Sequence, residues 1–416
     1  MDKMKRFIEC YIPIESCNLK CPYCYISQKR KLGEMANKRI TTEHQLDELK
    51  KAFSRKRWGG VCHVHLCASG ETLIPEDVLS VIRVLLEAGH YVAVVTNGTL
   101  TNRFEEISKW PEWLRSHLFL KFSFHYMEMR RLHMMERFFN NVNLMRKSGV
   151  SVSVELTPHD ELIPYIEDIK KVCMDHIGAL CHITIARDET TPDFAHLSKY
   201  SYEEYKKIWG VFDSELFDFK KQWFYKKPKE FCYMGEYGML VNLISGDYSQ
   251  CYPGKRKGNI FDLHKPIHFQ AMGYACPAPH CWNCHAFFAL GCVPGIHNAP
   301  TYAEVRNRVC ADGSEWLQPE VKAFFSQKLY DNNPRYSKGG GYFYDAGSGA
   351  QFYKAIHPKR EIGSPSEKEK RLKINTRKYP DNLISSVLYT RHEIAAKVQM
   401  PSMLQIVCSR WFSGCA

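Results

Sequence analysis

Residues 7–13 read FIECYIP, and residues 17–24 read CNLKCPYC. The first stretch is rich in aromatic and β-branched residues, which predicts a β-strand. The second stretch follows it directly, so Cys17, Cys21 and Cys24 lie on one loop at the carboxyl end of that strand. Three thiolates from one loop can converge on a metal centre, and we interpret this loop as a ligand set.

The spacing of these cysteines indicates what they could hold. A [4Fe–4S] cube normally takes four cysteine ligands, so three leave one iron open to a small molecule. A zinc knuckle is the alternative, because zinc sites also use cysteines at short spacing.

Strand and helix patterns alternate from Arg6 to about Arg187, which predicts βα units and a parallel sheet. Thr42 and Gln45 suit a capping box at one helix start, and Gly89 and Gly149 lie where two helices should end. The expected strands are Phe7–Pro13, His63–Cys67, Tyr91–Thr96, Phe119–Phe124, Ser151–Leu156 and His182–Ala186.

Composition limits the possible classes of protein. The 416 residues include 17 cysteines, an odd number that fits a disulfide framework poorly. No signal peptide is readable and no apolar run is long enough for a membrane helix, so we expect a cytoplasmic protein. The net charge of +12 suggests an anionic partner or merely a basic, soluble surface.

A second region, from about Phe231 to Cys310, is rich in Cys, Gly and Pro. Small metal-stapled modules have this composition, and a structural zinc site is again the alternative to an iron–sulfur cluster. We predict four parts: a sheet domain at 1–200, linking helices at 201–230, a cysteine-rich domain at 231–335 and a Gly-rich, basic extension at 336–416.

The C-x3-C-x2-C spacing, with Tyr23 before the third cysteine and a strand before the first, resembles the radical S-adenosylmethionine (SAM) superfamily. The resemblance covers roughly Phe7 to Arg187. It implies an α/β fold of the partial (β/α)6 barrel type and a SAM-binding [4Fe–4S] cluster on Cys17, Cys21 and Cys24.

The same resemblance implies which residues contact SAM. Ser69-Gly70-Glu71 stands where members of the family commonly carry Gly-Gly-Glu, which holds the SAM ammonium, and Ser69 is a mild departure. Asn97 lies in a Thr-Asn-Gly turn that is frequent in the family, although an ordinary turn is the alternative. Arg187 could meet a carboxylate or form a structural ion pair. The implied SAM contacts are Tyr23, Ser69, Gly70, Glu71, Asn97, Ser123 and Arg187.

The pattern Cys232-x13-Gly246-x4-Cys251 and a later Cys-x2-Cys resemble the SPASM extension of radical SAM enzymes, which carries one or two auxiliary [4Fe–4S] clusters. The later spacing departs from that pattern, and seven thiolates cannot fill two four-cysteine clusters. Either one cluster is complete, or two exist and one uses a non-cysteine ligand or an open iron. The implied ligands are Cys232, Cys251, Cys276, Cys281, Cys284, Cys292 and Cys310.

These resemblances imply reductive cleavage of SAM to a 5′-deoxyadenosyl radical and hydrogen abstraction from a substrate C–H bond. We expect a peptide substrate and a flavodoxin- or ferredoxin-like electron donor. Only sixteen residues precede Cys17, so we expect the tail or another protein to recognise any leader. The alternatives are a radical SAM oxidoreductase, dehydratase or epimerase acting on a sugar, nucleotide or glycan, and a metal-binding protein without turnover. No RNA-binding module accompanies the basic tail, so nucleic acid is not the expected partner.

Overall fold

A computed structural model describes residues 2–29 and 39–336 of the chain. The described residues up to Arg335 belong to one compact unit. The predicted extension at 336–416 lies outside the described residues apart from Tyr336, and so do Cys408 and Cys415. Within the described ranges, no helix has both the length and the apolar content that crossing a bilayer requires.

The described residues contain a nine-stranded sheet in the order β6-β5-β4-β3-β2-β1-β7-β8-β9. Strands β1 to β6 are parallel neighbours in chain order, which confirms the predicted α/β fold of the partial barrel type. The strands are β1 (Met4–Ile12), β2 (Val61–Ala68), β3 (Tyr91–Thr96), β4 (Leu118–Ser123), β5 (Ser151–Leu156), β6 (His182–Ile183), β7 (Gly238–Asn242), β8 (Asp247–Ser249) and β9 (Arg256–Asn259).

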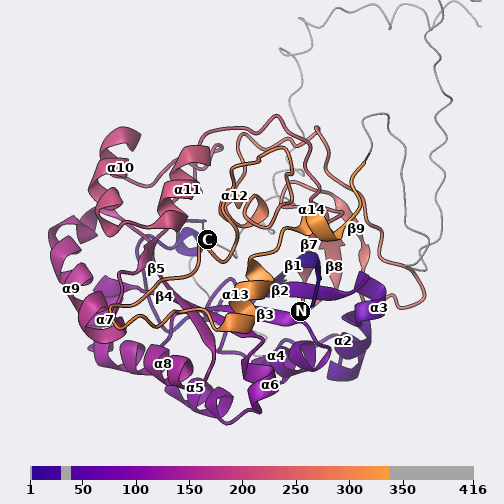
Figure 1. Ribbon diagram of the computed structural model, residues 1–416, viewed down its shortest axis with the longest axis horizontal. Helices are drawn as coiled ribbons and strands as arrows, with labels where there is room; N and C mark the ends of the chain where they lie inside the picture. The colour runs from indigo at the N-terminus through magenta and orange to yellow at the C-terminus, as the bar shows by residue number, and fades with distance from the viewer. Residues whose placement is uncertain (1, 30–38, 337–416) are drawn as a thin grey trace, which may run out of the picture. The chain divides into compact units, whose positions relative to one another are not determined.

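Helices that connect the parallel strands follow the outer side of the sheet, from α2 to α9 in Figure 1. The α-helices are α1 (Tyr25–Lys29), α2 (Leu46–Ala52), α3 (Arg55–Trp58), α4 (Val78–Glu87), α5 (Thr101–Ser108), α6 (Glu112–Arg115), α7 (Tyr126–Arg131), α8 (Met135–Lys147), α9 (Ile166–Ile177), α10 (Tyr202–Trp209), α11 (Glu215–Trp223), α12 (Cys284–Phe287), α13 (Pro319–Phe325) and α14 (Leu329–Asn332). Two 3-10 helices are η1 (Asp160–Tyr165) and η2 (Gly210–Phe212).

Two local predictions need correction. The capping box of α2 uses Gln45 and Glu48 instead of Thr42 and Gln45, because the Glu48 carboxylate accepts the backbone N–H of Gln45 at 2.9 Å. Strand β6 ends at Ile183 instead of continuing to Ala186, since its partner β5 ends at Leu156, which pairs with Ile183. The glycines predicted to end helices, Gly89 and Gly149, do have positive φ directly after α4 and α8.

The cysteine-rich region contributes strands that the sequence analysis did not predict. Strand β7 pairs in parallel with β1, from Phe7 opposite Gly238 to Tyr11 opposite Asn242. Strands β8 and β9 then extend the sheet in antiparallel pairing. The region therefore shares a sheet with the barrel, while the boundaries at 200, 230 and 335 stay predictions.

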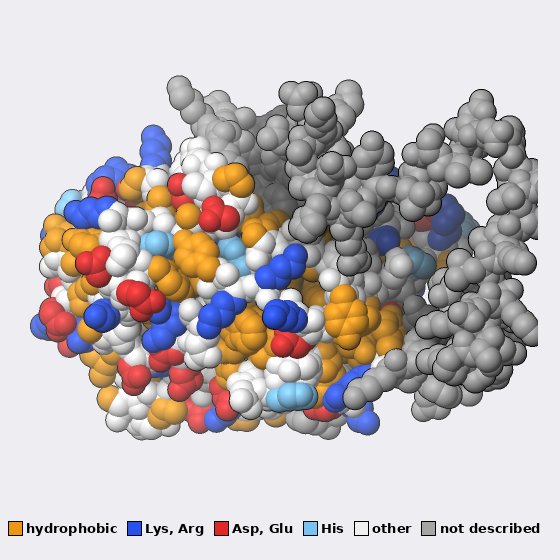
Figure 2. Space-filling view, turned by 90° about the horizontal axis from the view of Figure 1, so that it is seen from above, with side chains coloured by type: hydrophobic (Ala, Val, Ile, Leu, Met, Phe, Trp, Pro, Cys, Tyr) orange, Lys and Arg blue, Asp and Glu red, His pale blue; other side chains and the backbone are white. Residues whose placement is uncertain are grey.

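Figure 2 shows one face of the molecule, on which basic, acidic and hydrophobic side chains are intermixed. The net charge of +12 is thus not gathered into one basic patch among the described side chains of this face. A clustered stripe of Lys and Arg is the usual electrostatic footprint of nucleic-acid binding. The described part of this face does not display that footprint.

The two sides of the sheet differ in chemistry. Side chains alternate along a strand, so Ile8, Cys10 and Ile12 of β1 join the apolar core under the helices. The alternate positions face the barrel lumen and are unusually polar for buried residues. They include Glu9 of β1, His63 and His65 of β2, Lys121 of β4, Ser153 and Glu155 of β5, and His182 of β6.

An ion pair within this lumen joins the barrel to the later part of the chain. Glu155 on β5 forms a short contact with the guanidinium of Arg306, and its other oxygen lies 3.9 Å from Lys121 Nζ. Burial alone raises the pKa of Glu155, but attraction by Arg306 and Lys121 outweighs it and brings the pKa to about 2. Glu155 is therefore a buried, ionised carboxylate held by two cations.

We predict that Glu155→Gln lowers the free energy of unfolding by about 3 kcal/mol at neutral pH. Because the folded pKa is depressed, the stabilisation is complete above the ordinary glutamate pKa and is lost as the pH falls toward 2. Denaturant unfolding between pH 3 and 7 should show the gap to wild type closing with acid. The exposed Glu161→Gln is the control, and a gap independent of pH would contradict the prediction.

Candidate active site

A cavity of about 980 Å³, measured with its solvent-open mouth, lies at the carboxyl ends of the parallel strands. All three predicted cluster cysteines and all seven predicted SAM contacts line it. Their roles stay predictions, but the structure brings the ten residues together. They are Cys17, Cys21, Cys24, Tyr23, Ser69, Gly70, Glu71, Asn97, Ser123 and Arg187.

The cysteine loop runs from β1 into α1. The Cys24 N–H donates to the Cys21 carbonyl at 3.2 Å, and the Gln28 N–H donates to the Cys24 carbonyl at 3.1 Å. Burial raises the pKa of the Cys17 thiol to about 11 and raises that of Cys21 as well, with further repulsion between the thiols. Buried thiols of this kind ionise when a cation compensates their charge, as iron does.

The three thiols around the cavity are the donor set that a four-iron cube with one open iron requires. Across residues 2–29 and 39–336, no three His, Cys, Asp or Glu side chains come close enough together to hold one metal ion. A cube spreads its ligands over separate corners, so its thiolates stand farther apart than those around one ion. Three thiols around one cavity suit that arrangement.

The segment Ser69-Gly70-Glu71 after β2 runs along the approach to the cysteine loop. Its three backbone N–H groups donate to the carbonyls of Ile12, Ile14 and Ser16, at 3.0, 2.7 and 2.8 Å. A Cβ on Gly70 would stand only 2.0 Å from the Ser16 oxygen, so this close approach requires glycine. All three backbone N–H groups of the segment are thus already hydrogen-bonded. The backbone groups that it can offer to an ammonium group are its carbonyl oxygens.

Glu71 is buried and ties two strand ends together. One carboxylate oxygen accepts from Thr96 Oγ1 at 2.7 Å and from the Leu73 N–H at 3.0 Å, and the other accepts from the Asn97 N–H at 2.6 Å. Burial raises the pKa of Glu71, and these three hydrogen bonds oppose that rise. A carboxylate has about four acceptor sites, so Glu71 keeps about one for a ligand.

Asn97 links the turn after β3 to the cysteine loop. Its Nδ2 donates to Asn18 Oδ1 at 2.7 Å and lies 4.0 Å from Cys17 Sγ. Its Oδ1 accepts from Thr99 Oγ1 at 2.7 Å. An amide N–H beside a ligating sulfur is one of the features that tune a cluster's potential.

Aromatic side chains close the side of the cavity near Tyr23. The Tyr23 ring stacks on His159, with ring centroids 4.2 Å apart, and its hydroxyl is 2.7 Å from His125 Nδ1. Burial lowers the pKa of both histidines to about 4. Ser123, at the end of β4, also lines the cavity. The sequence analysis missed His159, although its position three residues after β5 is the kind of strand end that carries site residues.

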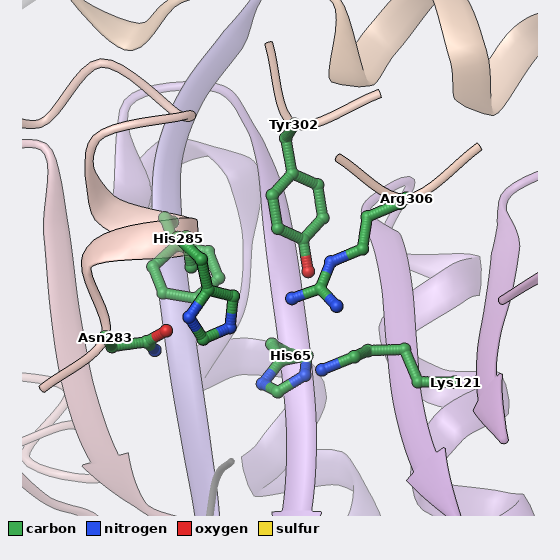
Figure 3. A pocket seen from close by; sticks show the side chains of 8 residues that line it. His65, Lys121, Asn283, His285, Tyr302 and Arg306 are labelled. Atoms are coloured by element: carbon green, nitrogen blue, oxygen red, sulfur yellow. The ribbon is translucent and has the colours of Figure 1, made fainter. Parts of the chain in front are cut away.

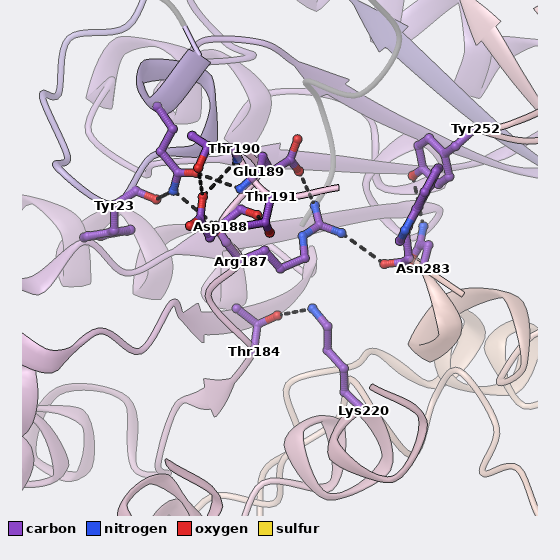
Figure 4. Close-up of polar contacts among 12 residues, drawn as sticks. Tyr23, Thr184, Arg187, Asp188, Glu189, Thr190, Thr191, Lys220, Tyr252 and Asn283 are labelled. Carbon is purple, nitrogen blue, oxygen red and sulfur yellow. Dashed lines mark hydrogen bonds and ion pairs between the residues drawn. The ribbon is translucent and has the colours of Figure 1, made fainter. Parts of the chain in front are cut away.

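Arg187 is committed to protein partners. Its Nη2 forms an ion pair with Glu189 at 3.0 Å, and its Nη1 donates to the Trp282 carbonyl at 3.2 Å, as Figure 4 shows. The Gln28 side chain donates to the Arg187 carbonyl at 3.1 Å. Arg187 therefore bridges α1 and the cysteine-rich region at the cavity wall, in agreement with the structural ion pair that we kept as the alternative.

Comparison with known families agrees with this geometry. Residues 11–173 match the family described as the Radical SAM superfamily. This match covers the cysteine loop and the four strands after it. This segment of the chain is therefore similar to the radical SAM enzymes.

The individual relatives of this chain are distant. A 102-residue segment, 24% of this chain, is 30% identical to 7-carboxy-7-deazaguanine synthase of Aquifex aeolicus (strain VF5) and spans 41% of that enzyme. Similar solved structures include Streptococcus suis SuiB, at 13% identity and a TM-score of 0.44 over 66% of this chain and 67% of SuiB. Another is anSMEcpe with bound AdoMet, at 16% identity and a TM-score of 0.43 over 64% of this chain and 81% of that one.

A hairpin explains the first spacing in the second cysteine set. Strands β7 and β8 pair in antiparallel fashion, with Leu240 opposite Ser249, so Cys232 before β7 and Cys251 after β8 come to the same end. Gly246 in the turn has φ +76°, and a Cβ there would lie 2.2 Å from the Phe261 ring. The C-x13-G-x4-C pattern is thus a hairpin with its required glycine.

At this end of the hairpin, electrostatic repulsion links four thiols, those of Cys232, Cys251, Cys276 and Cys281. Burial raises the pKa of Cys251, and repulsion from Cys232 and Cys276 raises it further. Burial likewise raises the pKa of Cys281, with repulsion from Cys284, Cys251 and Cys232. Cys284 is thus next to Cys281, and the Cys292 thiol interacts in the same way with Cys232.

The structure places Cys310 elsewhere than the predicted ligand set. Its Sγ donates to the Ile177 carbonyl at 3.2 Å at the end of α9 and accepts from Arg146 Nη2 of α8 at 3.1 Å. Cys310 is buried against the core of these helices, whereas the other six cysteines lie beside β7 and β8 and in the segment around α12. Spacing alone could not separate them.

We predict that Gly70→Ala displaces the cysteine loop, because the added methyl collides with the Ser16 carbonyl. The variant should lose about 2 kcal/mol or more of stability and bind less iron than wild type. Gly210→Ala is the matched control, since a Cβ there meets no atom within 4 Å. Thermal unfolding and iron analysis check the prediction, and equal values for Gly70→Ala and wild type would refute it.

Proposed function

We propose that this chain is a radical SAM enzyme that holds a [4Fe–4S] cluster on Cys17, Cys21 and Cys24 and cleaves SAM to abstract hydrogen from a peptide substrate. The observation that carries the proposal is the single cavity at the strand ends, which collects the three thiols and every predicted SAM contact. When held by these three thiolates, such a cluster would supply the one-electron reduction that cleaves SAM and makes hydrogen abstraction possible.

The chain's own residues then have positioning roles. Glu71 and the carbonyls of Ser69 and Gly70 would accept hydrogen bonds from the SAM ammonium, which suits the remaining acceptor capacity of Glu71. Asn97 would hold the loop and donate toward Cys17. The stacked rings of Tyr23, His125 and His159 would exclude water from the radical, as such chemistry requires.

We infer one complete auxiliary cluster on Cys232, Cys251, Cys276 and Cys281. Repulsion among Cys232, Cys251 and Cys276, and between Cys281 and both Cys251 and Cys232, supports this set. Once Cys310 is set aside, six thiols remain, which is too few for two four-cysteine clusters. Such a cluster could accept an electron from the substrate radical or bind the substrate directly.

A peptide is our first choice of substrate because the SPASM-like cysteine pattern is typical of peptide-modifying members of the superfamily. A flavodoxin- or ferredoxin-like donor and a separate leader-binding protein would accompany it. A small molecule is the second candidate, favoured by the segment that is 30% identical to 7-carboxy-7-deazaguanine synthase. A cytoplasmic location stays part of this proposal.

We predict that Cys24→Ala abolishes 5′-deoxyadenosine formation when anaerobically reconstituted protein is incubated with dithionite and SAM. The reason is that two thiolates cannot hold the cube with its open corner facing SAM. Cys173→Ala, a buried cysteine of α9, should keep the product. Chromatography of the nucleoside checks both, and persistence of the product in Cys24→Ala would exclude this cluster assignment.

We predict that Cys281→Ala lowers iron and sulfide content by one cluster per chain, whereas Cys310→Ala leaves both unchanged. Cys281 belongs to the four-thiol group, and Cys310 is hydrogen-bonded to Ile177. Iron and sulfide analysis together with EPR of the reduced proteins counts the clusters. Loss of iron in Cys310→Ala would show that this cysteine is a ligand after all.

A further inference from the structure

A second, much smaller cavity lies in the barrel lumen. Figure 3 shows His65 and Lys121 reaching it from the strands, and Asn283, His285, Tyr302 and Arg306 reaching it from the later part of the chain. Nothing in the proposed SAM and cluster sites uses these side chains. Its lining is Phe7, His65, Lys121, Asn283, His285, Ala286, Tyr302 and Arg306.

Arg306 brings hydrogen-bond donors that the described residues leave unused. Its side chain is fully buried, and Nη1 is bound to Glu155. Its Nε and Nη2 are buried and have no hydrogen-bond partner within the described ranges. A buried guanidinium N–H without a partner is costly, so two on one residue call for a ligand.

Lys121 adds a second cation to the same cavity. Its side chain is 4% exposed, and its ion pair with Glu155 has a long Nζ to Oε2 distance of 3.9 Å. An ammonium group has three donors, and an oxygen at that distance is not hydrogen-bonded. Lys121 therefore keeps donor capacity at the wall that it shares with Arg306.

The lining is electropositive. It holds the cations Lys121 and Arg306 and includes no carboxylate. Glu155 does not line the cavity, but it compensates part of this positive charge by its ion pairs with Arg306 and Lys121. Glu9, the other acidic residue nearby, accepts from Tyr252 at 2.7 Å and from Asn283 at 3.1 Å and does not line the cavity. Burial and then repulsion by Lys121 hold the pKa of His65 well below its ordinary value, so His65 does not add a third charge.

Strand register places this cavity directly beside the SAM cavity. Lys121 pairs with Val95, and Glu155 pairs with Ser123. Both Val95 and Ser123 line the SAM cavity at the strand ends. His65 lines the lumen cavity and lies two residues before Cys67, which lines the SAM cavity. Two residues along a strand span about 7 Å, so these two side chains are about that far apart. A group bound below would therefore present its neighbouring carbons to the reacting region above.

We propose that the lumen cavity binds a carboxylate of the substrate through Arg306 and Lys121, and so presents a nearby C–H bond to the SAM cavity. The part that concerns the substrate rests on the proposed function. A planar monoanion matches the guanidinium fork and the small space, whereas a phosphate dianion is bulkier and carries more charge than the two partly neutralised cations compensate. A peptide side chain, a peptide terminus or a small organic acid can supply this group.

The test uses full-length, cluster-loaded protein and acetate as the probe. Acetate should raise the melting temperature of wild type in a saturable way, and neutral acetamide of the same shape should not. Lys121→Met should weaken acetate binding about tenfold or more, as expected for loss of a charged hydrogen bond. Lys171→Met, an exposed lysine of α9, should bind acetate like wild type.

The outcomes separate this inference from the proposed function. If Lys121→Met still yields 5′-deoxyadenosine from SAM alone but no longer responds to acetate, the carboxylate site stands independently of SAM cleavage. Equal responses of wild type to acetate and acetamide would overturn the inference even if Lys121→Met fails to fold. A glutamate-containing blocked peptide and free glutarate, compared in the same assay, then distinguish peptide from small-molecule carboxylates.

Discussion

The arrangement of the site depends on three backbone hydrogen bonds between the segment after β2 and the chain leaving β1. The N–H groups of Ser69, Gly70 and Glu71 bind the carbonyls of Ile12, Ile14 and Ser16. This contact continues the pairing of the two strands beyond their ends and fixes where the cysteine loop begins. Glu71 then connects this segment to the end of β3 by hydrogen bonds with Thr96 and Asn97. Asn97 in turn is hydrogen-bonded to Asn18 of the cysteine loop.

Much of the barrel could be predicted because local chemistry specifies it: six parallel strands follow from short β-branched runs between amphipathic helices. The candidate SAM contacts were implied by the resemblance to the radical SAM superfamily, and they lie where strand ends converge at one edge of the sheet. Ser69, in the position of a usual glycine, is accommodated because its side chain hydrogen-bonds Tyr11 at 2.6 Å, while the indispensable glycine is Gly70.

Other features were not accessible from local pattern. Strand β7 is a short apolar run, and its partner β1 is more than two hundred residues away in the sequence, so no periodicity announces the pairing. The position of Cys310 is likewise set by its contacts with α8 and α9, which spacing between cysteines does not encode. Arg187 could be placed at the cavity, but only coordinates reveal that Glu189 already neutralises it.

The pairing of β7 with β1 also bears on how the chain folds. Strand β1 is hydrogen-bonded on both sides, by β2 and by β7, so it is an interior strand although more than two hundred residues separate it from β7. One edge of β1 must therefore stay uncovered while the ribosome adds more than two hundred residues. Such a delayed closure gives slow folding and an interval of exposure to aggregation. We therefore expect a chain with this topology to depend on chaperones during biosynthesis.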